Sequence, residues 1–167
     1  MDRATLRQLQ APLREQYAAD PASALTPLHA TADFRDDGIT CTVDGFAGPV
    51  RAGLHRATGG DGSDACSGDL LLEALLACAG VTLRSVATAM GVTLGAVTAR
   101  AESSFDARGT LGLDRDVPVG VGPVTVTFTA ETDADDTALE RLATSTERYC
   151  VVGHSLREVP RVVVVRP

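Results

Sequence analysis

The sequence has 167 residues, of which 44% are hydrophobic, and this length and composition predict one domain with a substantial core. The formal net charge is -7, and all 15 basic residues are arginines, so clustered positive charge for nucleic acid or an anionic membrane is not expected. The start has no secretory signal pattern, and the longest apolar stretch, residues 70–81, is interrupted by Glu73 and is shorter than the roughly 20 residues that span a bilayer. We therefore expect a soluble, cytoplasmic protein.

Residues 1–27 form an N-terminal helical arm in this prediction. Leu6, Leu9, Leu13 and Tyr17 follow helical spacing, and Pro21 ends the pattern. The arm packs either on the rest of the chain or on a partner. The remainder, residues 28–167, is predicted to be the single folded domain.

Alternating apolar and polar residues predict three strands after the arm, in residues 28–35, 39–47 and 49–55. The turn at residues 36–38 makes the first two a hairpin. A glycine-rich loop, residues 58–64, comes next.

The strongest helical signal is residues 69–90, which are apolar nearly all round and therefore predict a helix buried on most sides. Asp69 or Ser67 is expected to cap its start, and Gly91 to close it. Strands 96–105 and 124–132, a helix 133–149, a short turn or helix 151–159 and a last strand 160–167 follow. This order predicts an α+β fold, with strands packed around a long central helix.

The four cysteines are scattered and include no C-x-x-C pair, so they start as free thiols in a reducing cytosol. Cys78 shares a helix stripe with Thr82 and Ser85, which makes the stripe polar enough to face a cleft, although most helix cysteines are simply buried hydrophobes. Ala77 and Gly80 belong to a different stripe, one of small residues that suits close packing against another helix or a symmetry mate.

A reactive Cys78 needs something to lower its pKa. It lies too far from the start of its own helix to benefit from the helix dipole, and burial alone raises a thiol pKa. We therefore expect a cation from elsewhere in the fold, with Arg35, Arg51 and Arg56 as candidates, each of which is also compatible with a solvated strand-edge position.

The sequence gives less reason to expect reactivity at the other two cysteines. Cys66 precedes the helix and is interpreted as a loop-packing residue or a second reactive thiol, about 18 Å from Cys78 along a continuous helix and so out of disulfide range. Cys41 alternates within a strand and is expected in the core. The three histidines share no metal-ligand spacing, and a zinc site that combines Cys150 and His154 with Cys66 or Cys78 is only a minor alternative. No metal or cofactor is expected.

Two segments together resemble the OsmC/Ohr family of osmotically inducible and organic hydroperoxide resistance proteins. SGDLLLEALLACAGVTLRSVA is similar to the family's central-helix signature, and ERYCVVGHSL is similar to its second cysteine motif. The loop FDARGTLGLDRDVPVG also resembles that of relatives, and the resemblance covers residues 28–167.

The resemblance implies an OsmC-like, intertwined homodimer with the site at the interface. It makes Cys78 the nucleophile that attacks a hydroperoxide and Cys150 the resolving thiol, regenerated by a dithiol reductant of the lipoyl type. The family's activating arginine corresponds best to Arg56, 22 residues before Cys78, and less well to Arg51 or Arg35.

Three features depart from the family pattern. Gly68 stands where the family has a carboxylate, which leaves the adjacent Asp69 as a supporting residue; Val151 replaces the usual proline; and Cys66 is additional. The sequence thus predicts a thiol-dependent peroxidase for organic, alkyl or fatty-acid, hydroperoxides. The alternative is an OsmC-like dimeric binding or stress-associated protein without efficient turnover.

Overall fold

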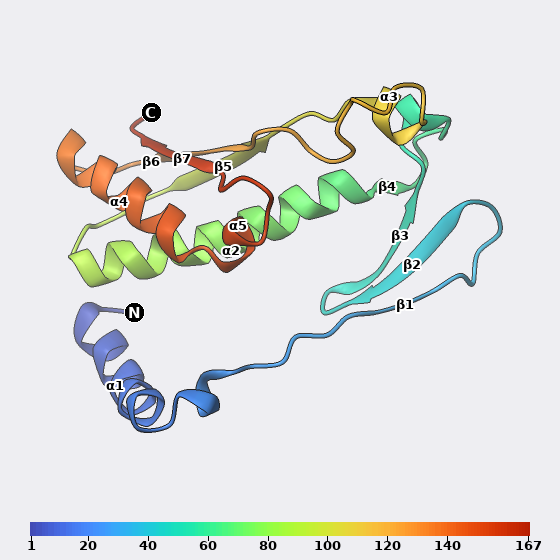
Figure 1. Cartoon of the computed structure of the whole chain (residues 1–167). Coiled ribbons are helices and arrows are strands. Elements are labelled where there is room, and N and C mark those ends of the chain that lie inside the picture. Colours follow the sequence, from blue (N-terminus) through green and yellow to red (C-terminus); the bar gives the residue numbers. More distant parts are fainter.

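The structure, a computed structural model, describes residues 1–167 and contains two separate small sheets joined by one long helix, α2 (Figure 1). The main helices are α1 (Arg3–Ala19), α2 (Ser67–Met90) and α4 (Asp136–Tyr149). Short helices are η1 (Pro21–Ala24), η2 (Arg56–Thr58), α3 (Ala107–Thr110) and α5 (Val151–His154). The mixed α+β fold is the one predicted.

The core lies where α2 and α4 meet the second sheet, which has the strand order β5-β6-β7 (Val97–Glu102, Thr125–Ala130 and Arg161–Val165). β6 is antiparallel to β5 and parallel to β7. Its alternating sequence buries Val126, Phe128 and Ala130 on one face, as expected for a strand with one covered side. This part of the chain forms a layer of helices on a sheet.

Helix α2 starts two residues earlier than predicted. Cys66 is its N-cap and makes no side-chain capping bond, so Ser67 and Asp69 lie in the first turn and the prediction that one of them caps the helix is wrong. Gly91 ends the helix at a φ of 74°, a left-handed conformation that glycine adopts without strain.

Within one chain α2 buries a single stripe rather than most of its surface. Leu75, Ala79, Leu83 and Ala87 recur every four residues and face the core, whereas Val81 is 73% exposed. By length and composition alone, α2 could also cross a membrane. Its buried stripe instead packs on α4 and β5, as a core helix does.

The first sheet has the order β1-β2-β3-β4 (Thr31–Asp33, Thr40–Gly45, Gly48–Gly53 and Ala65–Cys66). β1 and β2 form the predicted antiparallel hairpin, and β4 is a two-residue parallel strand beside β3. The sheet extends away from the core and meets the body mainly through β4 with α2 and η2 with α3 (Figure 1).

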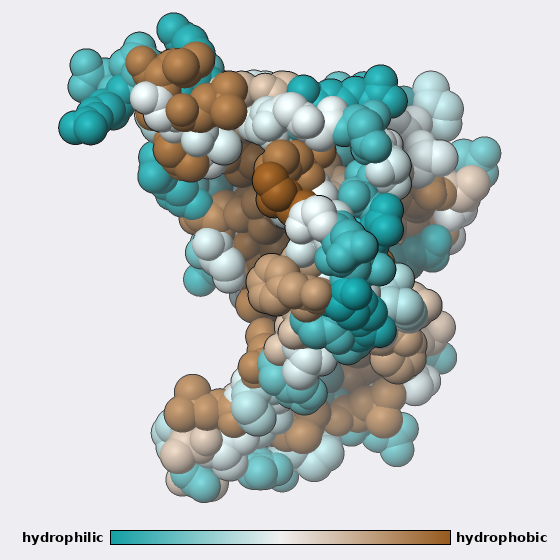
Figure 2. Space-filling view, turned by 90° about the vertical axis from the view of Figure 1, so that its right-hand side faces the viewer, coloured by the Kyte–Doolittle hydropathy of each residue, from teal (hydrophilic) through white to brown (hydrophobic).

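Large apolar side chains lie exposed on and beside this first sheet. Phe34, Ile39 and Phe46 are 82%, 74% and 111% exposed. Figure 2, which views the molecule from the right-hand side of Figure 1, shows apolar surface spread over this face and a hollow along one edge. One chain therefore leaves much apolar area in contact with water.

The N-terminal arm is helical, as the sequence predicts. Asp2 caps α1 by accepting a hydrogen bond from the Thr5 N–H at 2.8 Å, and the helix ends before Pro21. No residue of α1 is buried, and the helix contacts the body through α2. The extended segment 25–30 then leads to β1.

Candidate functional site

The fold brings Cys78 and Cys150 together. Cys78 lies in the middle of α2, and Cys150 lies between α4 and α5, which packs on α2. Cys150 is only 2% exposed, whereas Cys78 is half-buried at the edge of the same core. All four cysteines are free thiols. A small molecule from solvent therefore has access to Cys78 before Cys150.

Cys150 is held by the turn between two helices. Its backbone N–H donates to the Thr146 carbonyl at 3.1 Å, and its Sγ accepts a hydrogen bond from the Gly153 N–H at 3.3 Å. Cys150 is thus both the C-cap of α4 and the N-cap of α5. Gly153 fits closely here, because an added Cβ would lie 3.3 Å from the Cys150 Sγ.

The surroundings lower the pKa of Cys78 below the ordinary cysteine value. Burial is the largest single effect and raises the pKa, but hydrogen bonding outweighs it. The groups that lower the pKa are, in order, the Val152 N–H, the Cys150 thiol, the Val151 N–H and the Thr82 hydroxyl. Each of these interactions favours the thiolate, so Cys78 is the more acidic thiol of the pair.

Cys150 is affected in the opposite direction. Burial raises its pKa most, the Gly153 N–H lowers it, and the hydrogen bond to Cys78 and the charge of Cys78 raise it further. When the pair loses one proton, Cys78 is therefore the thiol that ionises and Cys150 the one that stays protonated. This is the protonation pattern required of a nucleophilic thiol and of a second thiol that reacts after it.

The backbone of α5 was not anticipated as part of the site. From the sequence, the start of α2 is too far from Cys78 to activate it, and a cation is expected instead. The structure instead directs the Val151 and Val152 amides at the start of α5 toward the sulfur. The pattern Cys150-x-x-Gly153, a cap followed by a small residue, was the available signal.

The predicted arginines do not reach Cys78 within one chain. None of them is among the causes of the Cys78 pKa shift. Arg35 pairs with Asp33 at 2.5 Å and with Asp44 at 3.3 Å, while Arg51 pairs with the mostly buried Asp64.

Arg56 lies in η2, beside α3 and away from the middle of α2 (Figure 1). Its guanidinium makes no hydrogen bond or ion pair with this chain and lies against Gly62, where an added Cβ would be 2.3 Å from its Nε. Arg56 is therefore the only one of the three arginines whose charge is not already paired.

Asp69 and the remaining cysteines lie apart from the thiol pair. Asp69 is exposed in the first turn of α2, about 13 Å along the helix axis from Cys78. Gly68 is beside it, and its nearest side-chain neighbour is the Cys66 Sγ. Cys41 lies on β2 opposite Ala52 and is half-buried. It is not part of the main core, so the prediction that it is a core residue is wrong.

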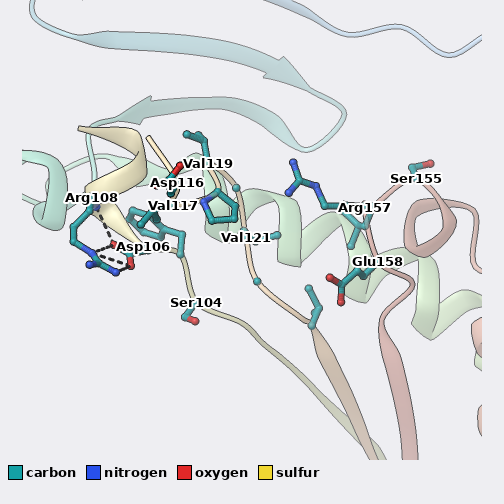
Figure 3. Close-up of a pocket in the computed structure, with 16 residues that line it drawn as sticks. Ser104, Asp106, Arg108, Asp116, Val117, Val119, Val121, Ser155, Arg157 and Glu158 are labelled. Atoms are coloured by element: carbon teal, nitrogen blue, oxygen red, sulfur yellow. Dashed lines mark hydrogen bonds and ion pairs between the residues drawn. The ribbon is translucent and has the colours of Figure 1, made fainter. Parts of the chain in front are cut away.

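A cavity of about 570 Å³ lies at the end of the second sheet, beyond α5 (Figure 3). The paired Asp106 and Arg108 lie at one end and Arg157 and Glu158 at the other, with Val121 between them. Neither Cys78 nor Cys150 lines it. The structure also has no cluster of three or more His, Cys, Asp or Glu side chains that could hold a metal ion.

Comparisons with known proteins agree with this architecture. The sequence model of the family described as OsmC-like protein matches residues 60–165. The fold is similar to the OsmC-like protein of Mycoplasma pneumoniae, with a TM-score of 0.64 and 15% identity over 85% of this chain and 95% of that one.

Two solved structures named for organic hydroperoxide resistance are also similar. The Legionella pneumophila protein has a TM-score of 0.59 and 20% identity, and covers 86% of this chain and 98% of its own. For OhrB of Bacillus subtilis the TM-score is 0.58 and the identity 15%, with coverages of 84% and 98%. No curated protein matches the sequence significantly. Because the family model matches well over half of the chain, this protein belongs to the OsmC-like family.

Proposed function

We propose that this protein is a thiol-dependent peroxidase that reduces organic hydroperoxides, with Cys78 as the nucleophile and Cys150 as the resolving thiol. The observation that carries the proposal is the contact between two thiols whose pKa values shift in opposite directions. Peroxide attack requires an ionisable thiol that solvent can reach, and Cys78 is both half-buried and the more acidic thiol of the pair. A buried, protonated neighbour is suited to the second step.

The reaction has three balanced steps. The Cys78 thiolate attacks the terminal oxygen of ROOH, the O–O bond breaks, and the departing alkoxide takes a proton to become ROH, which leaves Cys78 as a sulfenic acid. The Cys150 sulfur then attacks the Cys78 sulfur, forming a disulfide and releasing water. A dithiol reductant, possessing two thiols like a lipoyl group, reduces that disulfide and is itself oxidised to a disulfide.

The family supports an organic hydroperoxide as the substrate. Structural relatives are named for organic hydroperoxide resistance, and half-buried Leu71 lies on the Cys78 side of α2, two helical turns earlier. An alkyl or fatty-acid chain gains free energy by contact with such a surface, which hydrogen peroxide does not. The reducing cytoplasm is the compartment in which such a thiol pair would be regenerated.

We further propose that the active form is a homodimer. The Glu73, Ala77 and Arg84 stripe of α2 is exposed, and an added Cβ on Gly80 in the same stripe would meet nothing within 4 Å. A second α2 packed there would cover the apolar surface that one chain leaves open. The same arrangement would allow unpaired Arg56 of one subunit to approach Cys78 of the other, with Asp69 as a supporting carboxylate.

One observation favours the second candidate, a dimeric binding or stress-associated protein with little peroxidase turnover. No arginine contributes to the acidity of Cys78 within one chain, and Gly68 carries no carboxylate. If the dimer also leaves Cys78 without a cation, peroxide attack will be slow.

Titration with cumene hydroperoxide separates the two candidates. Free thiols are counted after addition of increasing amounts of the hydroperoxide to the reduced protein. The peroxidase loses two thiols per chain at one equivalent, and Cys78→Ser loses none, whereas Cys66→Ser behaves as the unaltered protein does. Thiol loss that is unaffected by Cys78→Ser would refute the peroxidase.

A further inference from the structure

Thr82 lies one helical turn after Cys78 and is bonded to it. The Thr82 hydroxyl donates a hydrogen bond to the Cys78 carbonyl oxygen at 2.8 Å. Residues four apart lie on the same face of a helix, so the hydroxyl is on the side of α2 that carries the thiol. Thr82, like Cys78, is half-buried.

Two other threonines in the chain make the same bond to the carbonyl four residues earlier. Thr88 donates to the Arg84 carbonyl at 2.9 Å, and Thr146 donates to the Leu142 carbonyl at 2.8 Å. Such bonds are an ordinary feature of threonine in helices. The bond therefore does not by itself distinguish Thr82, but Thr88, on the same helix α2, provides a matched comparison.

Thr82 differs from Thr88 in that the residue four positions earlier carries a second possible acceptor, the Cys78 sulfur, whereas Arg84 has no side-chain acceptor. Its hydroxyl also contributes to lowering the pKa of Cys78, after the larger effects of burial, the α5 amides and the Cys150 thiol. A hydroxyl carries one proton, which can point to the carbonyl oxygen or to the sulfur. The stronger acceptor is the one that bears negative charge.

We propose that Thr82 is a positioning residue for Cys78, whose hydroxyl turns from the Cys78 carbonyl oxygen to the Cys78 sulfur when the thiol ionises. The thiol proton leaves to water, and Thr82 keeps its own proton throughout. The bond holds the sulfur from the α2 side while the Val151 and Val152 amides hold it from α5. The thiolate is thereby fixed between two helices, and this deepens the peroxidase proposal, on which its catalytic importance rests.

The test is the pH profile of Cys78 alkylation by iodoacetamide, followed by peptide mass spectrometry, in the full-length protein. Thr82→Val keeps the β-branched shape and removes the hydroxyl, while Thr82→Ser keeps the hydroxyl. We expect Thr82→Val to slow alkylation at pH 7 by about threefold to tenfold, because the thiolate loses a hydrogen bond from the hydroxyl and solvent replaces only part of it. Thr82→Ser should restore most of the rate.

Thr88→Val is the control for loss of the backbone bond alone, and it should leave the Cys78 profile unchanged. If Thr82→Val folds poorly, Thr82→Ala carries the same expectation. The proposal would be overturned if the pH profile of Cys78 alkylation in Thr82→Val or Thr82→Ala matched that of the unaltered protein. A change in melting temperature alone would not support it.

The outcome is separable from that of the peroxidase proposal, since alkylation requires no peroxide. Suppose that Thr82→Val is alkylated more slowly but that the thiols of the unaltered protein do not react with cumene hydroperoxide. This result would support the positioning role of Thr82 and refute the peroxidase proposal. An unchanged profile in a protein that loses two thiols to the hydroperoxide would do the reverse.

Discussion

The thiol of Cys150 interacts with Cys78 and lowers the pKa of Cys78, although Cys78 lies in α2 and Cys150 lies in the turn between α4 and α5. α5 begins immediately after Cys150 and packs on α2, so one turn of chain positions the second thiol and two backbone amides at once. The geometry of this turn controls the acidity of Cys78, and several consequences can be measured.

Removal of the donor thiol should make Cys78 a weaker acid. In Cys150→Ala the thiolate loses one hydrogen bond, so we expect alkylation of Cys78 at pH 7 to be about threefold to tenfold slower. In both proteins the rate should fall as the pH drops through the pKa of Cys78, because the thiolate fraction falls. A faster Cys78 in Cys150→Ala would contradict the assigned direction of the hydrogen bond.

The fit of Gly153 should be sensitive to one methyl group. Gly153→Ala places a Cβ 3.3 Å from the Cys150 Sγ and 3.4 Å from the Pro160 Cδ, in a buried turn. We expect a loss of about 1–2 kcal/mol in the free energy of unfolding, measured by urea denaturation. Gly68→Ala is the matched control, since its Cβ makes an ordinary contact of 3.5 Å with the Cys66 Sγ, and it should not destabilise the protein.

Gly80 tests the dimer. Within one chain a side chain at this position meets nothing within 4 Å, so Gly80→Leu should fold normally as a monomer but prevent close packing of two α2 helices. Sedimentation at micromolar concentration should show a dimer for the unaltered protein and a monomer for Gly80→Leu. Ala89→Leu, an exposed position on the opposite side of α2, should remain dimeric. A monomeric unaltered protein would refute the dimer.

Arg56 tests the contribution of a cation across the interface. If Arg56 of the second subunit approaches the thiolate, Arg56→Ala should slow Cys78 alkylation near neutral pH by about tenfold without unfolding the protein. Arg141→Ala removes an exposed arginine from α4 and should have no effect. An unchanged rate in Arg56→Ala would transfer the role to Arg51 or Arg35, and each would first have to leave its present carboxylate partner.

The parts of the fold that the sequence predicted well are those with long, regular patterns. The strict alternation of β6 and the 24-residue α2 leave little choice of structure, and both are present where expected. The start of α2 was misplaced because Cys66, a poor capping residue, occupies the N-cap where Ser67 and Asp69 looked better. Helix α2 is apolar on nearly all sides, as the sequence indicates, but within one chain other elements pack against only one stripe of it.

The candidate site was harder to predict than the fold. The pairing of Cys78 with Cys150 was a prediction from family resemblance, because no local pattern relates two residues on separate helices. The amides of Val151 and Val152 could not be found by periodicity, since α5 has only four residues. Thr82 was placed on the Cys78 stripe by helical spacing, but its bond to Cys78 depends on a side-chain rotamer that a sequence does not specify.

Peptide mapping after oxidation by one equivalent of an alkyl hydroperoxide shows directly whether Cys78 and Cys150 react as a pair. We expect a single Cys78–Cys150 disulfide, with Cys41 and Cys66 still open to alkylation. In Cys150→Ser the same treatment should leave Cys78 as a sulfenic acid, and excess peroxide should convert it to a sulfinic acid. A disulfide between Cys66 and Cys150, with Cys78 still reduced, would contradict the account.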